Sequence, residues 1–211
     1  EEFTFHNVRV VVQAIANHLR KTYGDGPTSV VVGFDTRFLS ERYALEAAKL
    51  LARNRIEVFL AERDAPSQAL AYQVIKRKCQ GGINFTASFN PPRYNGLKFN
   101  VETGAPALPE VTDAVEEEIR QLMPGFSTLV VQAPDESISR IDFQADYLAF
   151  LQGKIDFGVM RDAKLRVAAD LLYGTSREYL DEILEENGVE VESIHGYVDP
   201  YFGGVSPSCT E

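Results

Sequence analysis

The chain has 211 residues, with 21 Lys or Arg against 31 Asp or Glu, and its formal net charge is -10. This acidic balance argues against a nucleic-acid groove, which needs a basic footprint, and against docking on an anionic membrane surface. With 45% hydrophobic and 25% charged residues, the composition is typical of a globular protein and not of a disordered or fibrous one.

The first 122 residues predict alternating helices and strands. A helix is expected first, because apolar residues recur at helical spacing after Thr4, which can cap it. The run TSVVVGF at residues 28–34 is apolar and β-branched, as in strands buried on both faces of a parallel sheet. The elements expected next are a helix capped by Ser40 to about Asn54, a strand Ile56–Leu60, a helix from Pro66 to about Lys78, strands Gly82–Thr86 and Leu97–Val101, and a helix from Pro109 to about Leu122.

A linker is predicted over residues 123–141, with one short strand at 128–132, and a second unit follows it. The elements expected in that unit are a helix Phe143–Leu151, a strand Leu165–Ala169, a helix Thr175–Asn187 and a strand Val189–Ser193. The alternation implies βαβ units. We therefore predict a three-layer α/β/α domain with a mixed, mostly parallel sheet at residues 1–140, then part of a second similar α/β domain at 141–211. Too few strands are expected there to close a core alone.

The sequence contains none of the usual nucleotide-binding, hydrolase or zinc-protease motifs (GxGxxG, GxxxxGK[ST], GxSxG, HExxH). Cys79 and Cys209 lie far apart, which argues against a disulfide framework or a structural zinc and favours a reducing cytoplasm. No apolar run approaches the roughly 18 residues of a membrane-spanning helix. Because the chain begins at Glu1, a preceding targeting segment is left open.

One segment combines residues that could carry chemistry, TASFNPPRYNGLKF at positions 86–99. It follows a buried strand, and ligands of α/β proteins bind beyond the carboxyl ends of strands, so Ser88 is expected at that rim. The two prolines stiffen the loop, and the Asn95-Gly96 turn brings Lys98 back towards the serine. A hydroxyl nucleophile, a rigid loop and a cation are parts that phosphoryl transfer needs. The alternative interpretation is a proline-rich turn with a capping serine.

The same segment resembles the phosphoserine loop of the α-D-phosphohexomutases, the phosphoglucomutase/phosphomannomutase group, whose usual form reads TASHNPP followed by YNG and Lys. EEFTFHNVRVVVQAIANHL resembles the first helix of that family, and VVVGFDTRFLSERYA resembles its first βα unit. VAADLLYGTSREYLDEILEENGVEVESIHGYVDPYFGG resembles the opening of its second domain. The resemblance covers nearly the whole chain in order. It implies the N-terminal part of a four-domain enzyme, with domain 1 and the start of domain 2.

The resemblance implies that Ser88, as phosphoserine, phosphorylates a hexose 1- or 6-phosphate. A hexose 1,6-bisphosphate, which also acts as activator, then reorients and returns its other phosphate to the serine. The phosphoserine at Ser88 would bind Mg²⁺, with the remaining metal ligands beyond Glu211. Lys98 matches an active-site lysine that aids proton transfer or charge balance. The matching positions that support the loop are Thr86, Phe89, Asn90, Asn95 and Arg37, and for Arg37 a surface ion pair is the alternative.

One departure from the family pattern is Phe89, which stands where the family usually has histidine. It removes a titratable group beside the nucleophile, so acid–base work would fall to Lys98 or to groups outside the chain. The expected partner is a small sugar phosphate, with no nucleic acid and no membrane, and the oligomeric state is left open. These residues alone are expected to be inactive. The alternatives are a degenerate homologue that binds sugar phosphate or a partner without turnover, and a mutase for another sugar phosphate such as glucosamine phosphate.

Overall fold

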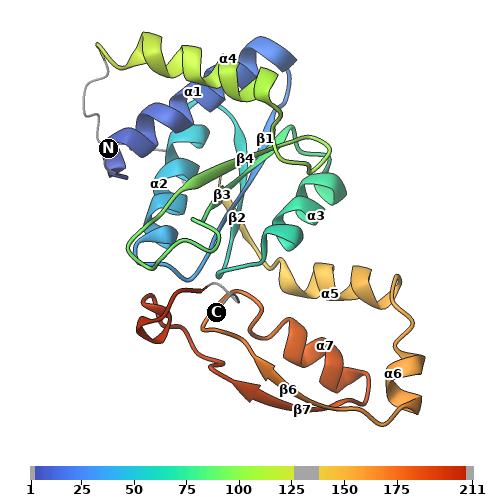
Figure 1. Ribbon diagram of the computed structural model, residues 1–211. Helices are drawn as coiled ribbons and strands as arrows, with labels where there is room; N and C mark the ends of the chain where they lie inside the picture. The colour runs from blue at the N-terminus through green and yellow to red at the C-terminus, as the bar shows by residue number, and fades with distance from the viewer. Residues whose placement is uncertain (1–2, 126–137, 208–211) are drawn as a thin grey trace.

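The computed structural model describes residues 3–125 and 138–207 (Figure 1). Its helices and strands follow the predicted alternation, so the α/β fold is confirmed. In chain order the elements are α1 Phe5–Tyr23, β1 Ser29–Phe34, α2 Ser40–Arg53, β2 Glu57–Ala61, α3 Ser67–Arg77, β3 Gly81–Phe85, β4 Leu97–Val101, α4 Pro109–Leu122, β5 Ile138–Ile141, α5 Gln144–Gln152, α6 Gly158–Asp162, β6 Arg166–Asp170, α7 Leu180–Glu186, β7 Glu190–Ile194 and the 3-10 turn η2 Phe202–Gly204.

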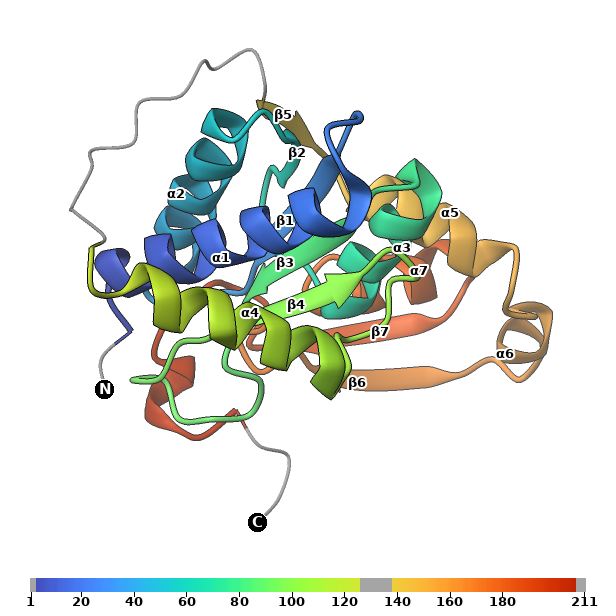
Figure 2. The same ribbon diagram turned by 90° about the horizontal axis from the view of Figure 1, so that it is seen from above.

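The first unit is a five-stranded sheet in the order β4-β3-β1-β2-β5. β1, β2, β3 and β5 are parallel, and β4 pairs antiparallel with β3 at one edge. α1 and α2 lie together on one face and α4 packs on α1, whereas α3 covers the other face (Figure 2). The sheet is therefore mixed and mostly parallel, with helices on both sides, as the pattern of the sequence predicts.

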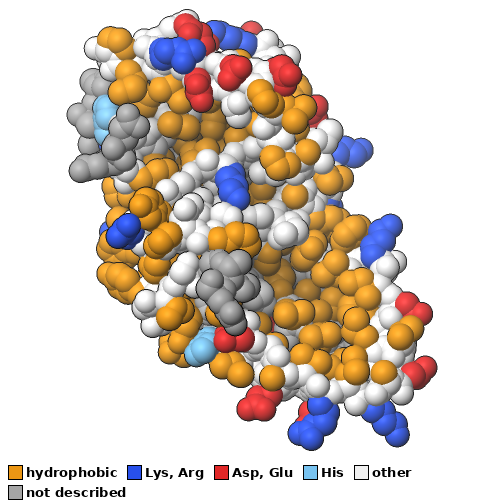
Figure 3. Space-filling view, viewed as in Figure 1, with side chains coloured by type: hydrophobic (Ala, Val, Ile, Leu, Met, Phe, Trp, Pro, Cys, Tyr) orange, Lys and Arg blue, Asp and Glu red, His pale blue; other side chains and the backbone are white. Residues whose placement is uncertain are grey.

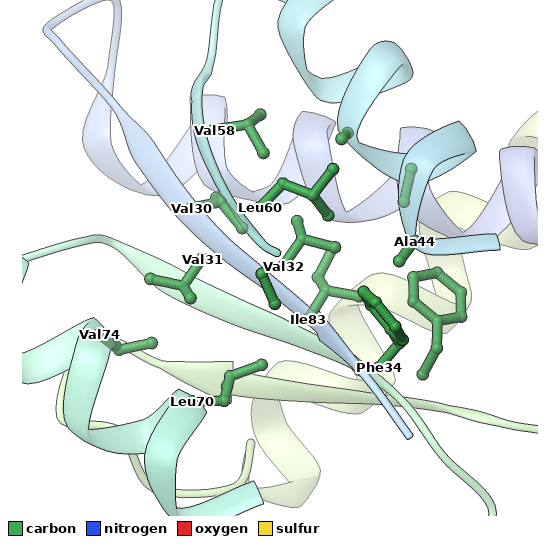
Figure 4. Packing of buried hydrophobic residues seen from close by; sticks show 14 of the residues in the cluster. Val30, Val31, Val32, Phe34, Ala44, Val58, Leu60, Leu70, Val74 and Ile83 are labelled. Atoms are coloured by element: carbon green, nitrogen blue, oxygen red, sulfur yellow. The ribbon is translucent and has the colours of Figure 1, made fainter. Parts of the chain in front are cut away.

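The core is built on β1, whose side chains point to both faces of the sheet. Val31 faces Leu70 of α3, whereas Phe34 faces Ala44 of α2 (Figure 4). All four side chains are buried. On β3, Gly82 lets α3 approach closely, because a Cβ there would lie 2.8 Å from side-chain atoms of Leu70. The run of valines thus forms a central strand because both of its faces are covered.

The linker prediction is wrong for residues 138–141. They form β5, which pairs in parallel with β2 and extends the first sheet, with Ile138 opposite Val58 and Ile141 opposite Ala61. A strand of four residues is too short to show a period of its own, and its pairing depends on the partner strand. The short strand predicted at 128–132 lies outside the described residues. The five-residue helix α6 is not anticipated either.

The helix predicted from Thr175 begins only at Leu180. Glu178 has φ +62°, a left-handed conformation that cannot lie inside an α-helix. Before it, Arg177 is buried and its guanidinium donates to Asp64 of the first unit at 2.6 Å. The contact between the two units therefore holds residues outside the helix that the local sequence pattern had placed inside it.

The second unit has a parallel pair of strands, β6 and β7, with α7 packed on β7. Five of its buried residues, Phe143, Leu148, Phe157, Tyr179 and Ile183, belong to the same apolar cluster as the first unit. Others, such as Leu171 and Val189, are buried outside that cluster. α5 packs against α3, and these contacts stabilise a unit whose own strands are too few.

Asp146 of α5 adds a polar contact to this packing. Its carboxylate pairs with Lys76 and accepts a hydrogen bond from Gln73 at 3.0 Å, both on α3. These bonds, from Lys76 first, hold the pKa of Asp146 below its ordinary value of 3.8. A lowered carboxyl pKa stabilises the folded chain above the unfolded pKa, and the contribution is lost as the pH falls through the folded pKa.

We therefore expect Asp146→Asn to lower the free energy of unfolding at about pH 6 and to match the wild type at about pH 2. Urea unfolding followed by circular dichroism at a series of pH values measures this. Asp113→Asn, at an exposed position of α4, controls for the change in net charge. A constant difference between Asp146→Asn and the wild type at every pH would contradict the role of the carboxylate.

The surface of the second unit is rich in apolar side chains, as Figure 3 shows in the lower part of the molecule. The large exposed apolar side chains of the second unit include Phe150, Ile155, Val159, Leu165, Leu180 and Ile194. None of the helices within residues 3–125 and 138–207 is long and apolar enough to cross a membrane. Apolar surface of this extent is typical of regions that contact more protein.

Candidate active site

The loops that follow β1 and β3 meet at the carboxyl edge of the sheet. β1 and β3 are parallel neighbours, with Phe34 opposite Phe85, so both strands end at this edge. The chain leaves β1 towards β2 on one side and leaves β3 towards β4 on the other. Such a divergence is the position at which open α/β sheets bind ligands. The loop after β3, residues 86–96, is called the serine loop below.

Ser88 is exposed on the serine loop and has an unusual backbone conformation. Its φ is +55°, in the left-handed region that residues with a Cβ seldom occupy. Two bonds hold it there. The Ser88 amide donates to Thr86 Oγ1 at 3.1 Å, and the Ser88 carbonyl accepts from Arg37 Nη2 at 2.7 Å. Strained backbone conformations that the surrounding structure holds in place cluster at functional sites. Ser88 is therefore a candidate functional residue.

Arg37 holds the serine loop from beneath. It is 3% exposed, so its pair with Asp35 is buried and is not a surface ion pair. Its Nε donates to Asp35 Oδ2 at 3.0 Å. Its terminal nitrogens donate to the loop carbonyls of Ser88 at 2.7 Å, Asn90 at 2.8 Å, Pro91 at 2.9 Å and Tyr94 at 3.1 Å. A guanidinium has five N–H donors, and all five are used here.

Asp35 connects the serine loop to the start of α2. Its Oδ1 accepts from the Arg37 amide at 3.0 Å and from Ser40 Oγ at 2.8 Å. Ser40 was predicted to cap the helix, and this is wrong. Leu39 occupies the N-cap position without a side-chain bond. The Ser40 hydroxyl instead joins Asp35 to Asn95, whose Nδ2 donates to it at 2.9 Å.

The other predicted residues divide into two groups. Asn90 supports the loop, because its Nδ2 donates to the Ala87 carbonyl at 2.8 Å. Phe89 is 69% exposed. Lys98 is also exposed and lies on β4 in register with Asn84. The structure thus brings Arg37, Thr86, Ser88, Asn90 and Asn95 into one hydrogen-bonded set, while Phe89 and Lys98 stay outside it.

Gly96 closes the serine loop where the chain enters β4. Its carbonyl accepts from the Thr86 amide at 3.0 Å, and a Cβ on Gly96 would lie 2.8 Å from the Thr86 carbonyl oxygen. We expect Gly96→Ala to lower the free energy of unfolding by about 1–3 kcal/mol, because main-chain atoms must shift. Gly26→Ala is the matched control, since nothing lies within 4 Å of its Cβ. Chemical denaturation measures both, and equal effects would contradict the steric argument.

One open hollow borders the serine loop, and a second lies beside Arg37. The first has a volume of about 800 Å³ and is lined by aromatic residues that include Phe38, Tyr43, Tyr94 and Tyr201. Burial raises the pKa of Tyr43. The other has a volume of about 420 Å³, and its lining includes Thr36, Arg37 and Asp64 from the first unit and Val198 and Pro200 from the second. Ser88 lines neither hollow and stands on the exposed rim of the loop.

A metal would find few ligands in this part of the chain. Within residues 3–125 and 138–207, no group of three or more His, Cys, Asp or Glu side chains is placed to hold a metal ion. A phosphate on the exposed Ser88 would supply oxygen atoms of the kind that Mg²⁺ prefers. Such a phosphate would be the contribution of the described residues to a Mg²⁺ site.

Sequence reasoning misses two contributors to the site. Asp35 directly follows the buried strand β1, a position that could have singled it out. Phe202 belongs to the second unit, and its ring lies over the guanidinium of Arg37 at 5.1 Å. Both views of the fold show the serine loop beside this C-terminal segment (Figures 1 and 2). No local sequence pattern predicts that contact, because the two residues are far apart in the chain.

Comparison with known proteins gives the same fold and order of domains. Residues 1–124 match the model of phosphoglucomutase/phosphomannomutase alpha/beta/alpha domain I, and residues 145–211 match domain II. A crystal structure of a protein from Thermus thermophilus, assigned as a phosphomannomutase, aligns with a TM-score of 0.89 at 28% identity. The alignment covers 98% of this chain and 45% of that chain.

Curated relatives include mutases for more than one sugar phosphate. A phosphoglucomutase of Staphylococcus saprophyticus is 31% identical over 188 residues, which cover 85% of this chain and 33% of the relative. A phosphoglucosamine mutase of Prochlorococcus marinus is 28% identical over 178 residues, covering 83% of this chain and 36% of the relative. The chain thus spans about a third of the length of these two relatives. With both domain models matched in order, the chain belongs to the phosphoglucomutase/phosphomannomutase family.

Proposed function

We propose that this chain carries the phosphorylated serine of an enzyme that interconverts hexose 1-phosphate and hexose 6-phosphate. The observation that carries the proposal is the geometry of Ser88, an exposed hydroxyl in a left-handed backbone on a loop held by Arg37. A residue that gives and takes a phosphoryl group must be accessible and must return to one position. A loop tied to a buried guanidinium supports both requirements.

The proposed reaction has two symmetric halves. In the first, the Oγ–P bond of phosphoserine 88 breaks while a free hydroxyl oxygen of the sugar phosphate bonds to phosphorus. That hydroxyl loses its proton, and Ser88 Oγ takes one up. The product is a hexose 1,6-bisphosphate and a free Ser88. After the sugar reorients, Ser88 Oγ loses its proton and bonds to the other phosphorus, and the sugar oxygen leaving that phosphate takes up a proton. The serine is thus a covalent carrier, and the net change is an isomerisation.

Charge balance in these steps is assigned to groups around the loop. Mg²⁺ bound to the phosphoserine supplies positive charge against the transferring phosphoryl group. Phosphoserine 88 is the ligand from this chain, and the other ligands are proposed to come from outside the 211 residues. Lys98 is exposed on the strand that leaves the loop, and we assign it proton transfer or charge balance. We also propose a cytoplasmic setting, which the cysteine spacing supports.

Two alternatives have specific support. Phosphoglucosamine mutases among the relatives favour glucosamine phosphate as a second candidate substrate. Phe89, which is exposed beside the nucleophile, favours a homologue that binds sugar phosphate or a partner without turnover. The two alternatives differ in outcome, because the first leaves a phosphate on Ser88 and the second does not.

The test uses a form of the protein as long as its mutase relatives, incubated with hexose 1,6-bisphosphate and Mg²⁺. Intact mass and peptide mapping are expected to show one phosphate, on Ser88. Rates with glucose, mannose and glucosamine 1-phosphates then rank the sugars. A protein that takes no phosphate and converts none of the three would support the binding alternative. Phosphate on another residue would contradict the assignment of Ser88.

A further inference from the structure

The segment that carries Phe202 has a defined backbone. The carboxylate of Asp199 accepts from the amides of Tyr201 at 2.8 Å and Gly203 at 2.9 Å, and its carbonyl accepts from the Phe202 amide at 3.0 Å. Phe202 and Gly203 have left-handed φ values of +51° and +65°. A Cβ on Gly203 would lie 2.8 Å from the ring of Tyr173. The turn is therefore closed by its own bonds and by close packing, and it fixes the direction of the Phe202 side chain.

The Phe202 ring covers the one part of Arg37 that hydrogen bonds leave open. All five N–H donors of Arg37 lie in the guanidinium plane and are taken by Asp35 and the serine loop. The faces of that plane have no donor. The ring centroid of Phe202 lies 5.1 Å from Arg37 Cζ, within the range of a cation–π contact. Phe202 is 4% exposed, so the contact is shielded from water.

The contact depends on how the second unit sits on the first. Arg177 of the second unit pairs with Asp64, which follows β2, at 2.6 Å. Arg63, next to Asp64, pairs with Glu178. Both pairs join the second unit to the carboxyl edge of the sheet, the edge from which the serine loop also extends. The position of the second unit and the covering of Arg37 are therefore linked.

We propose that Phe202 is a positioning residue for Ser88. Its ring holds the guanidinium of Arg37 in place, and Arg37 in turn holds four carbonyls of the serine loop. Phe202 makes the loop depend on the second unit, so the serine is fixed only when that unit is docked. The inference rests on the proposed function for its meaning in catalysis, and on the observed contacts for the ordering of the loop.

The test compares Phe202→Leu, which keeps apolar volume and loses the ring face, with Phe202→Tyr, which keeps the face. Hydrogen exchange of the 211-residue chain is measured by mass spectrometry at residues 86–96. We expect Phe202→Leu to speed exchange of this loop about 2- to 30-fold, the factor for losing a cation–π contact. Phe202→Tyr is expected to keep the wild-type rate. Val159→Ala, which removes an exposed apolar side chain from the same unit, is the control.

Exchange at β1 in the same samples serves as the reference for the core. An unchanged serine loop in Phe202→Leu would overturn the proposal, and so would equal acceleration in Phe202→Leu and Phe202→Tyr. Faster exchange of β1 and the loop together would also overturn it, because Phe202 would then be a general packing residue. The measurement needs no activity. A freed loop in a protein that never phosphorylates Ser88 would refute the proposed function and leave the positioning role intact.

Discussion

Ser88→Ala is expected to abolish sugar phosphate interconversion in a form of the protein as long as its relatives. Removing the hydroxyl leaves no atom to carry the phosphoryl group between the two halves of the reaction. Loss of a covalent nucleophile costs roughly 10⁴- to 10⁶-fold in kcat. The coupled assay from glucose 1-phosphate, with trace bisphosphate as activator, measures this rate.

Stability is expected to stay nearly unchanged in Ser88→Ala, because the hydroxyl is exposed and the two bonds of this residue come from its main chain. Ser193→Ala is the matched control, since Ser193 is an exposed serine on β7. It should keep full activity. Retained interconversion in Ser88→Ala would show that the phosphate is carried elsewhere and would remove the basis of the proposed function.

Arg37→Ala is expected to cause the largest structural effect of the substitutions considered. It leaves the Asp35 carboxylate without its partner and frees four loop carbonyls at once. Removing one member of a buried ion pair typically costs about 3–5 kcal/mol. We expect a lower urea midpoint for the 211-residue chain and fast hydrogen exchange at residues 86–96.

Arg37→Lys separates charge from geometry. An ammonium has three donors and no planar fork, so it can serve at most three of the five acceptors. We therefore expect a partly freed loop and, in the longer protein, a kcat about 10²-fold lower, the usual effect of misplacing a reacting group by about 1 Å. Arg93→Lys, at an exposed arginine of the same loop, is the control. A fully functional Arg37→Lys would mean that charge alone matters.

Much of the fold follows from periodicity. The valines of β1, the helical spacing after Thr4 and the alternation of elements predict the first sheet and its covering helices, because burial on two faces leaves a strong pattern. β5 is not predicted because a strand of four residues is too short to show an alternation of apolar and polar residues. The start of α7 is misplaced because Arg177 is drawn into an ion pair with Asp64, a residue more than a hundred positions away.

The candidate site shows the same division. The serine loop can be predicted from Ser88, the prolines and Lys98, because these residue types in this order match one family. The resemblance assigns Arg37 to loop support, but its contacts cannot be predicted from the sequence, because its partners are main-chain carbonyls, which every residue has. Only the folded chain shows that a single guanidinium meets four of them.

The amino-acid sequence by itself determined the alternating α/β architecture, the family and the position of the loop that carries Ser88. Local periodicity and contiguous motifs carry that information. Only the tertiary structure decided that Asp35 and Phe202 contribute to holding the serine loop, and that Arg37 does so through four main-chain carbonyls. It also decided that part of the second unit packs into the core of the first. Those contacts join residues far apart in the chain, and their formation depends on how strands and helices pack, which no short stretch of sequence contains.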